Sequence, residues 1–391
     1  MSRQLINRSA DLSRLVEEGY EVDVRHGHLV MSGVPYVTPA RAVRLGTLIS
    51  PLALAGDVTA RPTDHVVHFA GEYPCRADGT PITQIAHQSS DQTLAPGIVS
   101  NHSFSSKPPN GYADYYEKMT SYAAILVSQA QAINENATAQ TGRVIESTDG
   151  DGPFVYIDNA SSRVGIAAIT EKLRLRRVAV FGLGGSGGYI LDQLAKLPIG
   201  EIALHDGDRM LQHNAFRAPG AVTLEELRAR PLKVDYYRDR YSAMHRNIVA
   251  HPYFVERGNV SKIGAVDFAF ISMDPGDAKL ALVEHLEAVD APFIDVGMGV
   301  EIVDGSLIGQ LRVSVSLPGH RQELRERVSF VEPTKDDLYA KNIQIADLNA
   351  LNAILAVARF KRYFGFYADL ENELFSRYAT DGNHLLNEGH P

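Results

Sequence analysis

The chain has a single cysteine, Cys75, among its 391 residues. One cysteine cannot form an intrachain disulfide, and it cannot supply the paired cysteines of a CxxC…CxxC zinc site, so we expect no zinc. An acyl-acceptor role for Cys75 is one alternative. A lone cysteine beside a strand is more often a small buried hydrophobic residue, which is the interpretation that we favour.

Long hydrophobic runs are also missing. No stretch approaches 18 uninterrupted apolar residues, so the sequence predicts no membrane span. The first residues, "MSRQLINRSADLSRLVEEGY", contain no apolar core of the kind that a secretion signal carries. We therefore expect a cytoplasmic protein with no membrane partner.

Basic residues are fewer than acidic ones, 38 against 47, which gives a formal net charge of −9. A surface that follows a phosphate backbone needs concentrated Lys and Arg, so the composition disfavours a nucleic-acid partner. The hydrophobic share of 45% and the charged share of 22% are ordinary for a globular protein. The length suggests two or three domains.

A change of pattern divides the chain. Residues 143–162 are rich in Gly, Asp and Ser and have no sustained period. We therefore expect an α+β domain over 1–148 and a second domain over 149–391. In the first domain we expect a surface loop at 100–112, because Pro and Gly break both periods there, and a helix at 114–133.

After the break, short apolar strands alternate with helical segments. The expected strands are 176–181, 201–205, 267–272, 292–296 and 310–316. A long amphipathic helix is expected over 342–366. Such alternation predicts a mainly parallel sheet with helices on both faces.

The first strand of this pattern ends in "GLGGSG", residues 182–187, which fits G-x-G-x-x-G. The glycines allow a tight turn, and the helix that follows offers amide donors and a positive dipole end to a phosphate. Asp206 lies 19 residues after Gly187, at the end of the second strand, where an acidic residue holds a ribose hydroxyl. At this point NAD and ATP fit equally well.

The residues beyond the second strand favour ATP. Asp208 is followed by Asn214, Arg217 and Lys233. A NAD site has no need of the last three, whereas an adenylating enzyme must neutralise a triphosphate before a carboxylate can attack its α-phosphorus. Asp274 ends a later strand at the edge where ligands bind in such sheets, and its carboxylate is suited to Mg²⁺.

This ordered combination resembles the ThiF/MoeB adenylating superfamily, which includes the E1-like ubiquitin-activating enzymes. The resemblance covers roughly residues 155–390. It implies a Rossmann-like adenylation domain that binds ATP and Mg²⁺. The substrate that it implies is the C-terminal glycine carboxylate of a ubiquitin-like protein, which attacks ATP, releases pyrophosphate and becomes an acyl-adenylate.

The resemblance also assigns roles to individual residues. Asp274 would hold Mg²⁺, and Arg163 resembles the arginine that family dimers insert into the partner's ATP site, which implies a homodimer. Asp208 is either a further metal or phosphate contact or a loop residue. The remaining nucleotide-binding residues implied are Gly182, Gly184, Gly185 and Gly187 in the phosphate loop, Asp206 at the ribose, Asn214, Arg217 and Lys233 at the phosphates, and Asn259 near the nucleotide.

Three features depart from the family pattern. No cysteine follows residue 75, so the second domain has no cysteine for a thioester step; the zinc-binding cysteine pairs are missing as well. Pro275 stands after Asp274, where the family commonly has Asn. We therefore expect transfer from the adenylate to a nucleophile outside this domain.

The first domain resembles an uncharacterised domain that precedes ThiF-type domains in bacterial operons encoding ubiquitin-like proteins. Residues 66–75, "VVHFAGEYPC", are distantly similar to the central strands of ubiquitin-conjugating enzymes. This likeness implies that the domain recruits the ubiquitin-like protein or a conjugating-enzyme-like carrier. Two other functions stay open for the chain as a whole, a NAD-dependent oxidoreductase and a nucleotide-binding scaffold without turnover.

Overall fold

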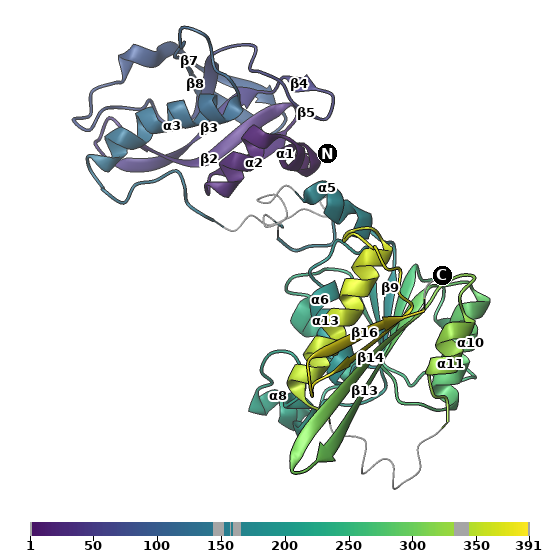
Figure 1. The fold of residues 1–391 in the computed structure, drawn as a ribbon. Coiled ribbons are helices and arrows are strands. Elements are labelled where there is room, and N and C mark those ends of the chain that lie inside the picture. Colours follow the sequence, from purple (N-terminus) through teal and green to yellow (C-terminus); the bar gives the residue numbers. More distant parts are fainter. Residues whose placement is uncertain (1, 144–151, 157, 159–165, 332–343, 390–391) are drawn as a thin grey trace. The chain divides into compact units, whose positions relative to one another are not determined.

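The structure is a computed structural model, and its residues form two compact units (Figure 1). One unit lies within Met1–Ser147 and Tyr156–Ala168, and the other lies within Thr148–Val155 and Ile169–Pro391. The residues that the structure describes are 2–143, 152–156, 158, 166–331 and 344–389.

The first unit is built on a six-stranded antiparallel sheet of order β1-β2-β3-β6-β8-β7. Its strands are β1 Glu21–Arg25, β2 His28–Val37, β3 Val43–Pro51, β6 Val66–Ala70, β7 Ala86–Ala95 and β8 Ile98–Ser105. The short strands β4 Leu54–Ala55 and β5 Val58–Thr59 pair with each other. The expected loop at 100–112 is therefore wrong in its first half, because Ser103 and Phe104 are buried between β6 and β7.

Helices cover one face of this sheet. They are α1 Ser2–Arg8, α2 Ala10–Glu17, the short η1 Thr83–Ile85 and α3 Tyr115–Gln131. The expected helix at 114–133 is confirmed as α3, which begins where the Asp114 carboxylate accepts a hydrogen bond from the Glu117 amide at 2.8 Å. Figure 1 shows α3 lying across β2 and β3.

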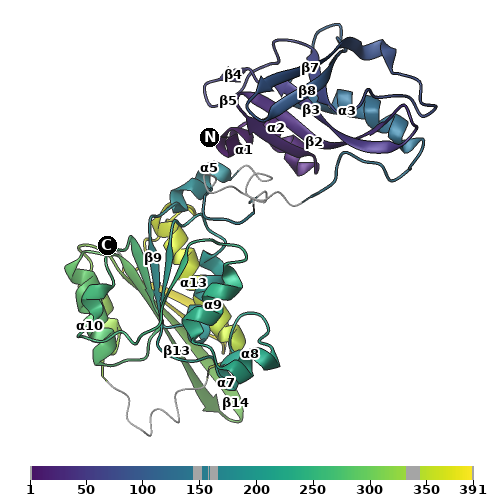
Figure 2. The same ribbon diagram turned by 180° about the vertical axis from the view of Figure 1, so that it is seen from behind.

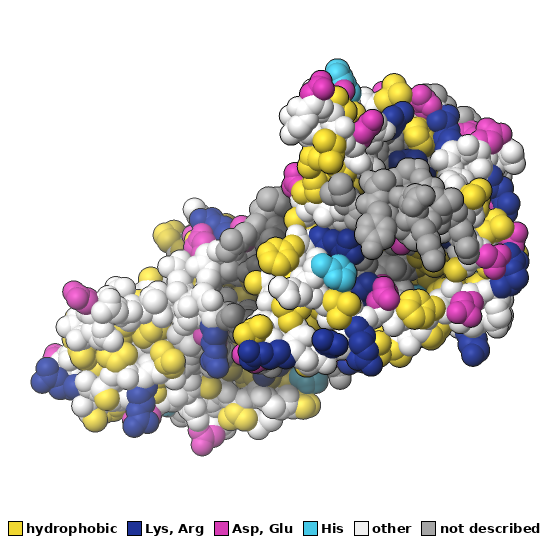
Figure 3. All heavy atoms as spheres, turned by 90° about the horizontal axis from the view of Figure 1, so that it is seen from below, with side chains coloured by type: hydrophobic (Ala, Val, Ile, Leu, Met, Phe, Trp, Pro, Cys, Tyr) yellow, Lys and Arg dark blue, Asp and Glu magenta, His cyan; other side chains and the backbone are white. Residues whose placement is uncertain are grey.

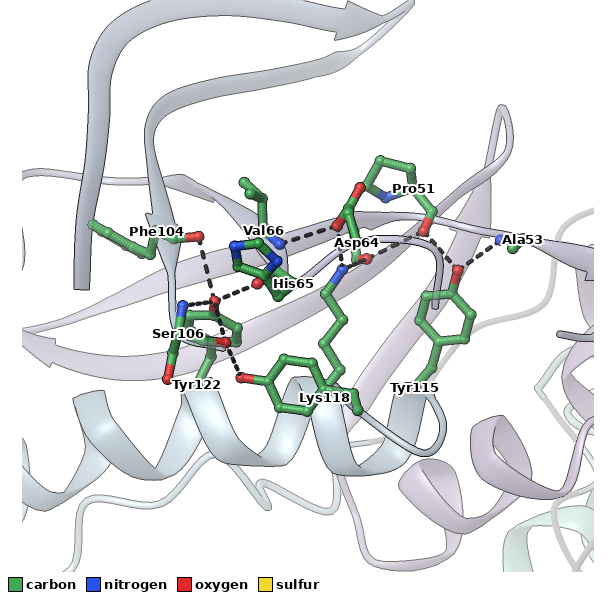
Figure 4. A network of polar contacts seen from close by, with 12 residues as sticks. Pro51, Ala53, Asp64, His65, Val66, Phe104, Ser106, Tyr115, Lys118 and Tyr122 are labelled. Atoms are coloured by element: carbon green, nitrogen blue, oxygen red, sulfur yellow. Dashed lines mark hydrogen bonds and ion pairs between the residues drawn. The ribbon is translucent and has the colours of Figure 1, made fainter. Parts of the chain in front are cut away.

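A buried lysine fixes α3 to the sheet (Figure 4). The Lys118 side chain is only 1% exposed, and its Nζ donates to Asp64 Oδ1 at 2.9 Å and to Ser50 Oγ at 3.0 Å. Burial lowers the pKa of Lys118, and the Asp64 carboxylate opposes this shift. The pair explains how a charged side chain is tolerated in this core.

Cys75 lies in the same unit and is fully buried with Val37, Ala130 and Ala137. Burial raises the pKa of its thiol, and the nearby carboxylates of Asp78 and Glu72 act in the same direction. A nucleophilic cysteine needs an accessible thiolate. The surroundings of Cys75 therefore favour a packing role.

The second unit contains an eight-stranded sheet of order β11-β10-β9-β12-β13-β14-β15-β16. The first five strands, β11 to β13 in this order, are parallel, and from β13 to β16 each strand is antiparallel to the next. The strands are β9 Val178–Phe181, β10 Ile202–His205, β11 Ile248–His251, β12 Phe268–Ile271, β13 Phe293–Val303, β14 Ser306–Ser316, β15 Phe375–Ala379 and β16 His384–Glu388.

Helices pack on both faces of this sheet (Figures 1 and 2). One face carries α6, α9 and α13, and the other carries α10 and α11. The helices from α5 onward are α5 Ala167–Thr170, η2 Glu171–Leu173, α6 Gly185–Leu194, α7 Gln212–Ala215, α8 Leu224–Ala229, α9 Lys233–Tyr241, η3 Val260–Lys262, α10 Asp277–Ala288, α11 Gln322–Arg327 and α13 Ala346–Tyr363. The predicted fold class is confirmed: a mainly parallel α/β sheet in one unit and a smaller antiparallel unit before it.

The surface is mixed in charge. On the face drawn in Figure 3, basic and acidic side chains lie among hydrophobic ones. Across the described ranges, each helix is too short or too polar to cross a membrane.

Candidate functional site

A pocket of about 450 Å³ opens at the carboxyl ends of β9 and β12. In the sheet, β10 lies on one side of β9 and β12 lies on the other side. The strand order therefore reverses at β9. Ligands bind at such points in open α/β sheets. The lining residues include Gly184, Gly185, Ser186, Asp274, Lys279, Gly297, Gly299, Gln310, Arg312, Asn349 and Arg377.

The predicted phosphate loop forms one end of the pocket. Gly182 has φ +83°, and a Cβ there would overlap the carbonyl oxygen of Ser272, the residue just after the adjacent strand β12. A Cβ on Gly187 would overlap the carbonyl oxygen of Gly182. Gly184, by contrast, faces open space where α6 begins. The glycines therefore make a tight turn that leaves the start of a helix accessible to an anion.

Asn349, in the first turn of α13, lies directly against this loop. Its Oδ1 accepts a hydrogen bond from Ser186 Oγ at 2.9 Å, and a Cβ on Gly185 would overlap its amide. The side chain is 1% exposed, and its Nδ2 is buried with no partner among the described residues. A buried donor left without an acceptor is costly, so this nitrogen fits an anionic ligand in the pocket.

The Asp206 carboxylate fixes the glycine loop and the turn that follows β10. Its Oδ2 accepts a hydrogen bond from the Leu183 amide at 2.6 Å, and its Oδ1 accepts one from the Asp208 amide at 2.7 Å. The side chain is 8% exposed. A carboxylate has further lone pairs, so the predicted ribose contact of Asp206 stays a prediction.

Lys233, at the start of α9, is paired with a carboxylate in this structure. Its Nζ lies 2.8 Å from Asp208 Oδ2 and 3.8 Å from Asp206 Oδ2. The lysine side chain is 7% exposed, whereas that of Asp208 is 56% exposed. A phosphate contact by Lys233 would therefore have to share the ammonium group with Asp208.

Arg217 provides a cation whose hydrogen bonds are incomplete. It is half-buried, and its Nε is buried without a partner in the part of the chain that the structure describes. Burial lowers the pKa of Arg217, and the charge of Asp274 acts against this shift. Asn214 fixes the turn before it, since Asn214 Oδ1 accepts the Leu211 amide at 2.9 Å.

Asp274 is exposed and lines the pocket beyond β12. No group of three or more His, Cys, Asp or Glu suited to a metal ion occurs within the described ranges. A Mg²⁺ ion at Asp274 would therefore draw its other ligands from substrate oxygens and water, as this ion commonly does.

The other predicted site residues lie elsewhere. Asn259 closes a turn, accepting the Glu256 amide at 2.8 Å and donating to the Phe254 carbonyl at 2.8 Å, and it does not line the pocket. Arg163 falls outside the described residues. The structure thus brings Gly184, Gly185 and Asp274 to the pocket, and Asp206 is joined to the loop beside it.

Sequence reasoning missed a buried ionic group in the pocket wall. The Asp295 side chain is fully buried, and its oxygens lie 2.5 Å from Lys279 Nζ and 2.7 Å from an Arg312 terminal nitrogen. Lys279 is 2% exposed. An aspartate inside the apolar strand "PFIDV" was the one local signal of this group, because buried carboxylates need partners.

The family described as "Domain of unknown function (DUF6791)" matches residues 10–159. The chain is also homologous to ubiquitin-like modifier-activating enzyme 5 of Culex quinquefasciatus, with 24% identity over 184 residues, 44% of this chain and 45% of that protein. The protein of the same name from Aedes aegypti is 23% identical over 159 residues, 38% of this chain and 40% of its own length. The chain thus spans less than half the length of these relatives.

Similar solved structures include E. coli MccB with ATP, at 17% identity and a TM-score of 0.44, covering 60% of this chain and 72% of that one. PaaA is similar at 19% identity and a TM-score of 0.43, covering 56% of this chain and 75% of that one. Homology over part of its length therefore relates this chain to the activating enzymes of ubiquitin-like modifiers.

Proposed function

We propose that the second unit adenylates the C-terminal carboxylate of a ubiquitin-like protein with ATP. The observation that carries this proposal is the buried, unpartnered Asn349 amide nitrogen against an open glycine loop at the sheet's switch point. The Arg217 guanidinium does not line the pocket, but it lies close enough to Asp274 for their charges to interact. Such donors are suited to a polyphosphate. The homology to activating enzymes of ubiquitin-like modifiers supports the same substrate class.

In this reaction a carboxylate oxygen of the substrate bonds to the α-phosphorus of ATP, and the bond from that phosphorus to the bridging α–β oxygen breaks. Pyrophosphate leaves with that electron pair. The loop amides, Arg217 and Lys233 would hold the phosphates and neutralise the leaving charge. Mg²⁺, held by Asp274, would supply further charge neutralisation when bound.

A NAD-dependent oxidoreductase fits the pocket less well. Beyond the glycine loop the pocket carries Lys279, Arg312 and Arg377 against two carboxylates, the buried Asp295 and the exposed Asp274. Such a pocket suits an anion better than the cationic nicotinamide ring of NAD⁺. A non-catalytic scaffold would bind the nucleotide at the same site as an adenylating enzyme, but it would not convert the nucleotide to products.

Thermal melting with ATP·Mg²⁺, AMP and NAD tests the nucleotide. A ligand that binds only the folded state, at 100 times its dissociation constant, should stabilise by about 2.7 kcal/mol. We expect a shift with ATP·Mg²⁺ that NAD does not give, that weakens in Arg217→Ala and that persists in Arg228→Ala, a matched change at an exposed arginine of α8.

A shift with NAD alone would contradict the proposal. Enzyme and scaffold are then separated by pyrophosphate release with a ubiquitin-like protein as substrate. The wild type should release pyrophosphate and Asp274→Ala should not, whereas a scaffold releases none in either form.

A further inference from the structure

The pocket wall opposite the phosphate loop is one face of the sheet. Strand pairing sets Gly297 opposite Arg312 and Gly299 opposite Gln310, and on the next strand it sets Arg377 opposite Arg312. Residues directly opposite on antiparallel strands share a face, so these five residues form a continuous surface. All five line the pocket.

Two arginines directly opposite each other are unfavourable unless an anion lies between or beside them. Arg312 is partly neutralised, since it donates to Asp295 Oδ2 at 2.7 Å and to Ser314 Oγ at 2.8 Å. Arg377 is exposed and donates to the neutral Gln310 Oε1. The face therefore carries more positive charge than the buried Asp295 balances.

The position of the Arg312 guanidinium is fixed by buried groups. Asp295 Oδ2 accepts a hydrogen bond from it, and Asp295 Oδ1 forms an ion pair with Lys279 Nζ at 2.5 Å; the Asp295 and Lys279 side chains are at most 2% exposed. A Cβ on Gly297 would lie 2.6 Å from an Arg312 terminal nitrogen, so glycine at this position lets the guanidinium lie close to the strand. Arg312 keeps 24% of its side chain exposed, and two of its five donor hydrogens meet the acceptors named above.

The wall between the arginines and the loop has no obstructing side chain at Gly299, which faces open space. A peptide backbone without side chains can approach such a surface closely. From this arrangement we infer that Arg312 and Arg377 bind the carboxylate end of an extended, glycine-terminated peptide. The inference rests on the proposed function, because it orients that substrate toward the phosphate loop; Arg312 and Arg377 are positioning residues for it.

The test uses the full chain and a fluorescein-labelled decapeptide ending in Gly-Gly, prepared as the free acid and as the C-terminal amide. Anisotropy should show the acid binding about tenfold tighter than the amide, because charge-assisted hydrogen bonds to the carboxylate are lost in the amide. Arg377→Ala should weaken binding of the acid about tenfold and leave the amide unchanged. Arg228→Ala should behave as the wild type.

Equal binding of acid and amide would overturn the inference, as would unchanged binding in both Arg377→Ala and Arg312→Gln. Melting with ATP·Mg²⁺ is measured on the same samples. An ATP shift that is retained in Arg377→Ala places the defect at the peptide site. A wild type that binds the acid selectively but shows no ATP shift would instead contradict the proposed function and leave the arginine site standing.

Discussion

At the scale of single residues, the site combines groups that are fully bonded with groups that are not. Asp206 uses one carboxylate oxygen to hold the glycine loop and the other to hold the turn after β10, whereas Asn349 Nδ2 and Arg217 Nε are buried without partners among the described residues. Other buried polar atoms, such as His205 Nε2 and Arg362 Nε, also have no partner among the described residues, so a missing partner alone does not identify a ligand-binding group. Asn349 differs because it also lines the pocket, which makes it a candidate for a ligand contact.

Asn349 allows the most direct test of a ligand contact. We expect Asn349→Ala to weaken ATP binding about tenfold, since one hydrogen bond to a charged group is lost. Asn349→Asp should weaken it further, because a carboxylate repels the phosphates. Asn352→Ala is the control: Asn352 donates to the Gly297 carbonyl at 3.0 Å and does not line the pocket, so ATP affinity should persist. Titration with a fluorescent ATP analogue measures all four proteins; equal affinities would contradict a ligand role.

Because His205, the last residue of β10, is buried, we expect the free energy of unfolding to depend on pH. Burial lowers its pKa to about 3, and the neighbouring His251 acts in the same direction. Between the unfolded pKa of about 6.5 and the folded value, the unfolded chain binds the extra proton, so stability falls as pH falls through this window. Urea unfolding of the second unit should show a loss of about 2 kcal/mol from pH 6.5 to 5. In His205→Phe the loss of stability between pH 6.5 and 5 should be smaller. An unchanged loss would show that other titrating groups cause it.

At the scale of elements, the β9–α6 turn decides where the ligand can approach. Gly182 and Gly187 are required by the packing of the turn itself, whereas Gly184 borders open space. The same residue type thus serves two purposes within six residues. One part of the motif builds the loop, and the other keeps the helix start uncovered.

This distinction can be tested with two alanines. Gly187→Ala should lower the free energy of unfolding by about 1–3 kcal/mol, because the new Cβ overlaps the Gly182 carbonyl oxygen. Gly184→Ala has an allowed φ of −67° and free space, so stability should change little while ATP affinity falls. Urea unfolding measures the stability of both variants, and titration measures their ATP affinity. A stable Gly187→Ala together with a destabilised Gly184→Ala that still binds ATP would contradict the two roles.

At the scale of the whole molecule, all lining residues of the candidate pocket come from the second unit, and the first unit has its own hydrophobic core. The first unit matches a domain of unknown function and carries the only cysteine in a buried position. We propose that it recruits the ubiquitin-like protein or a conjugating-enzyme-like carrier. Adenylation and recruitment would then be divided between the two units.

Assembly of two chains is tested by complementation. If Arg163 acts in the partner's ATP site, Arg163→Ala and Asp274→Ala should each be inactive alone. A mixed dimer holds one site with both residues intact, so mixing the two proteins should restore pyrophosphate release to about a quarter of the wild-type rate per chain, the fraction expected from random pairing of equal amounts. No recovery in a mixture shown by size-exclusion chromatography with multi-angle light scattering to be dimeric would place Arg163 in its own chain's site or outside it.

The sequence by itself determined the parts whose information is local. The glycine spacing, the strand before it and Asp206 after the next strand lie within 30 residues, so the β–α–β unit and its glycine turn could be predicted, while the phosphate contact stays a prediction. Local spacing also placed Asp274 at a strand end and predicted α3 and α13. The strands β8, β15 and β16 could not be predicted in this way, because weak alternation becomes a strand only through its neighbours.

Only the tertiary structure decided which distant side chains meet. Asn349 reaches the loop from 163 positions away in the sequence, and Arg312 and Arg377 become neighbours through strand register. Lys233 is a case in which the sequence suggested one contact and the fold shows another. Its position in the sequence indicated a phosphate contact, whereas in the structure it forms an ion pair with Asp208. Burial and register depend on the whole packed sheet, which is why the charge and the unmet donors of this pocket appear only once the chain is folded.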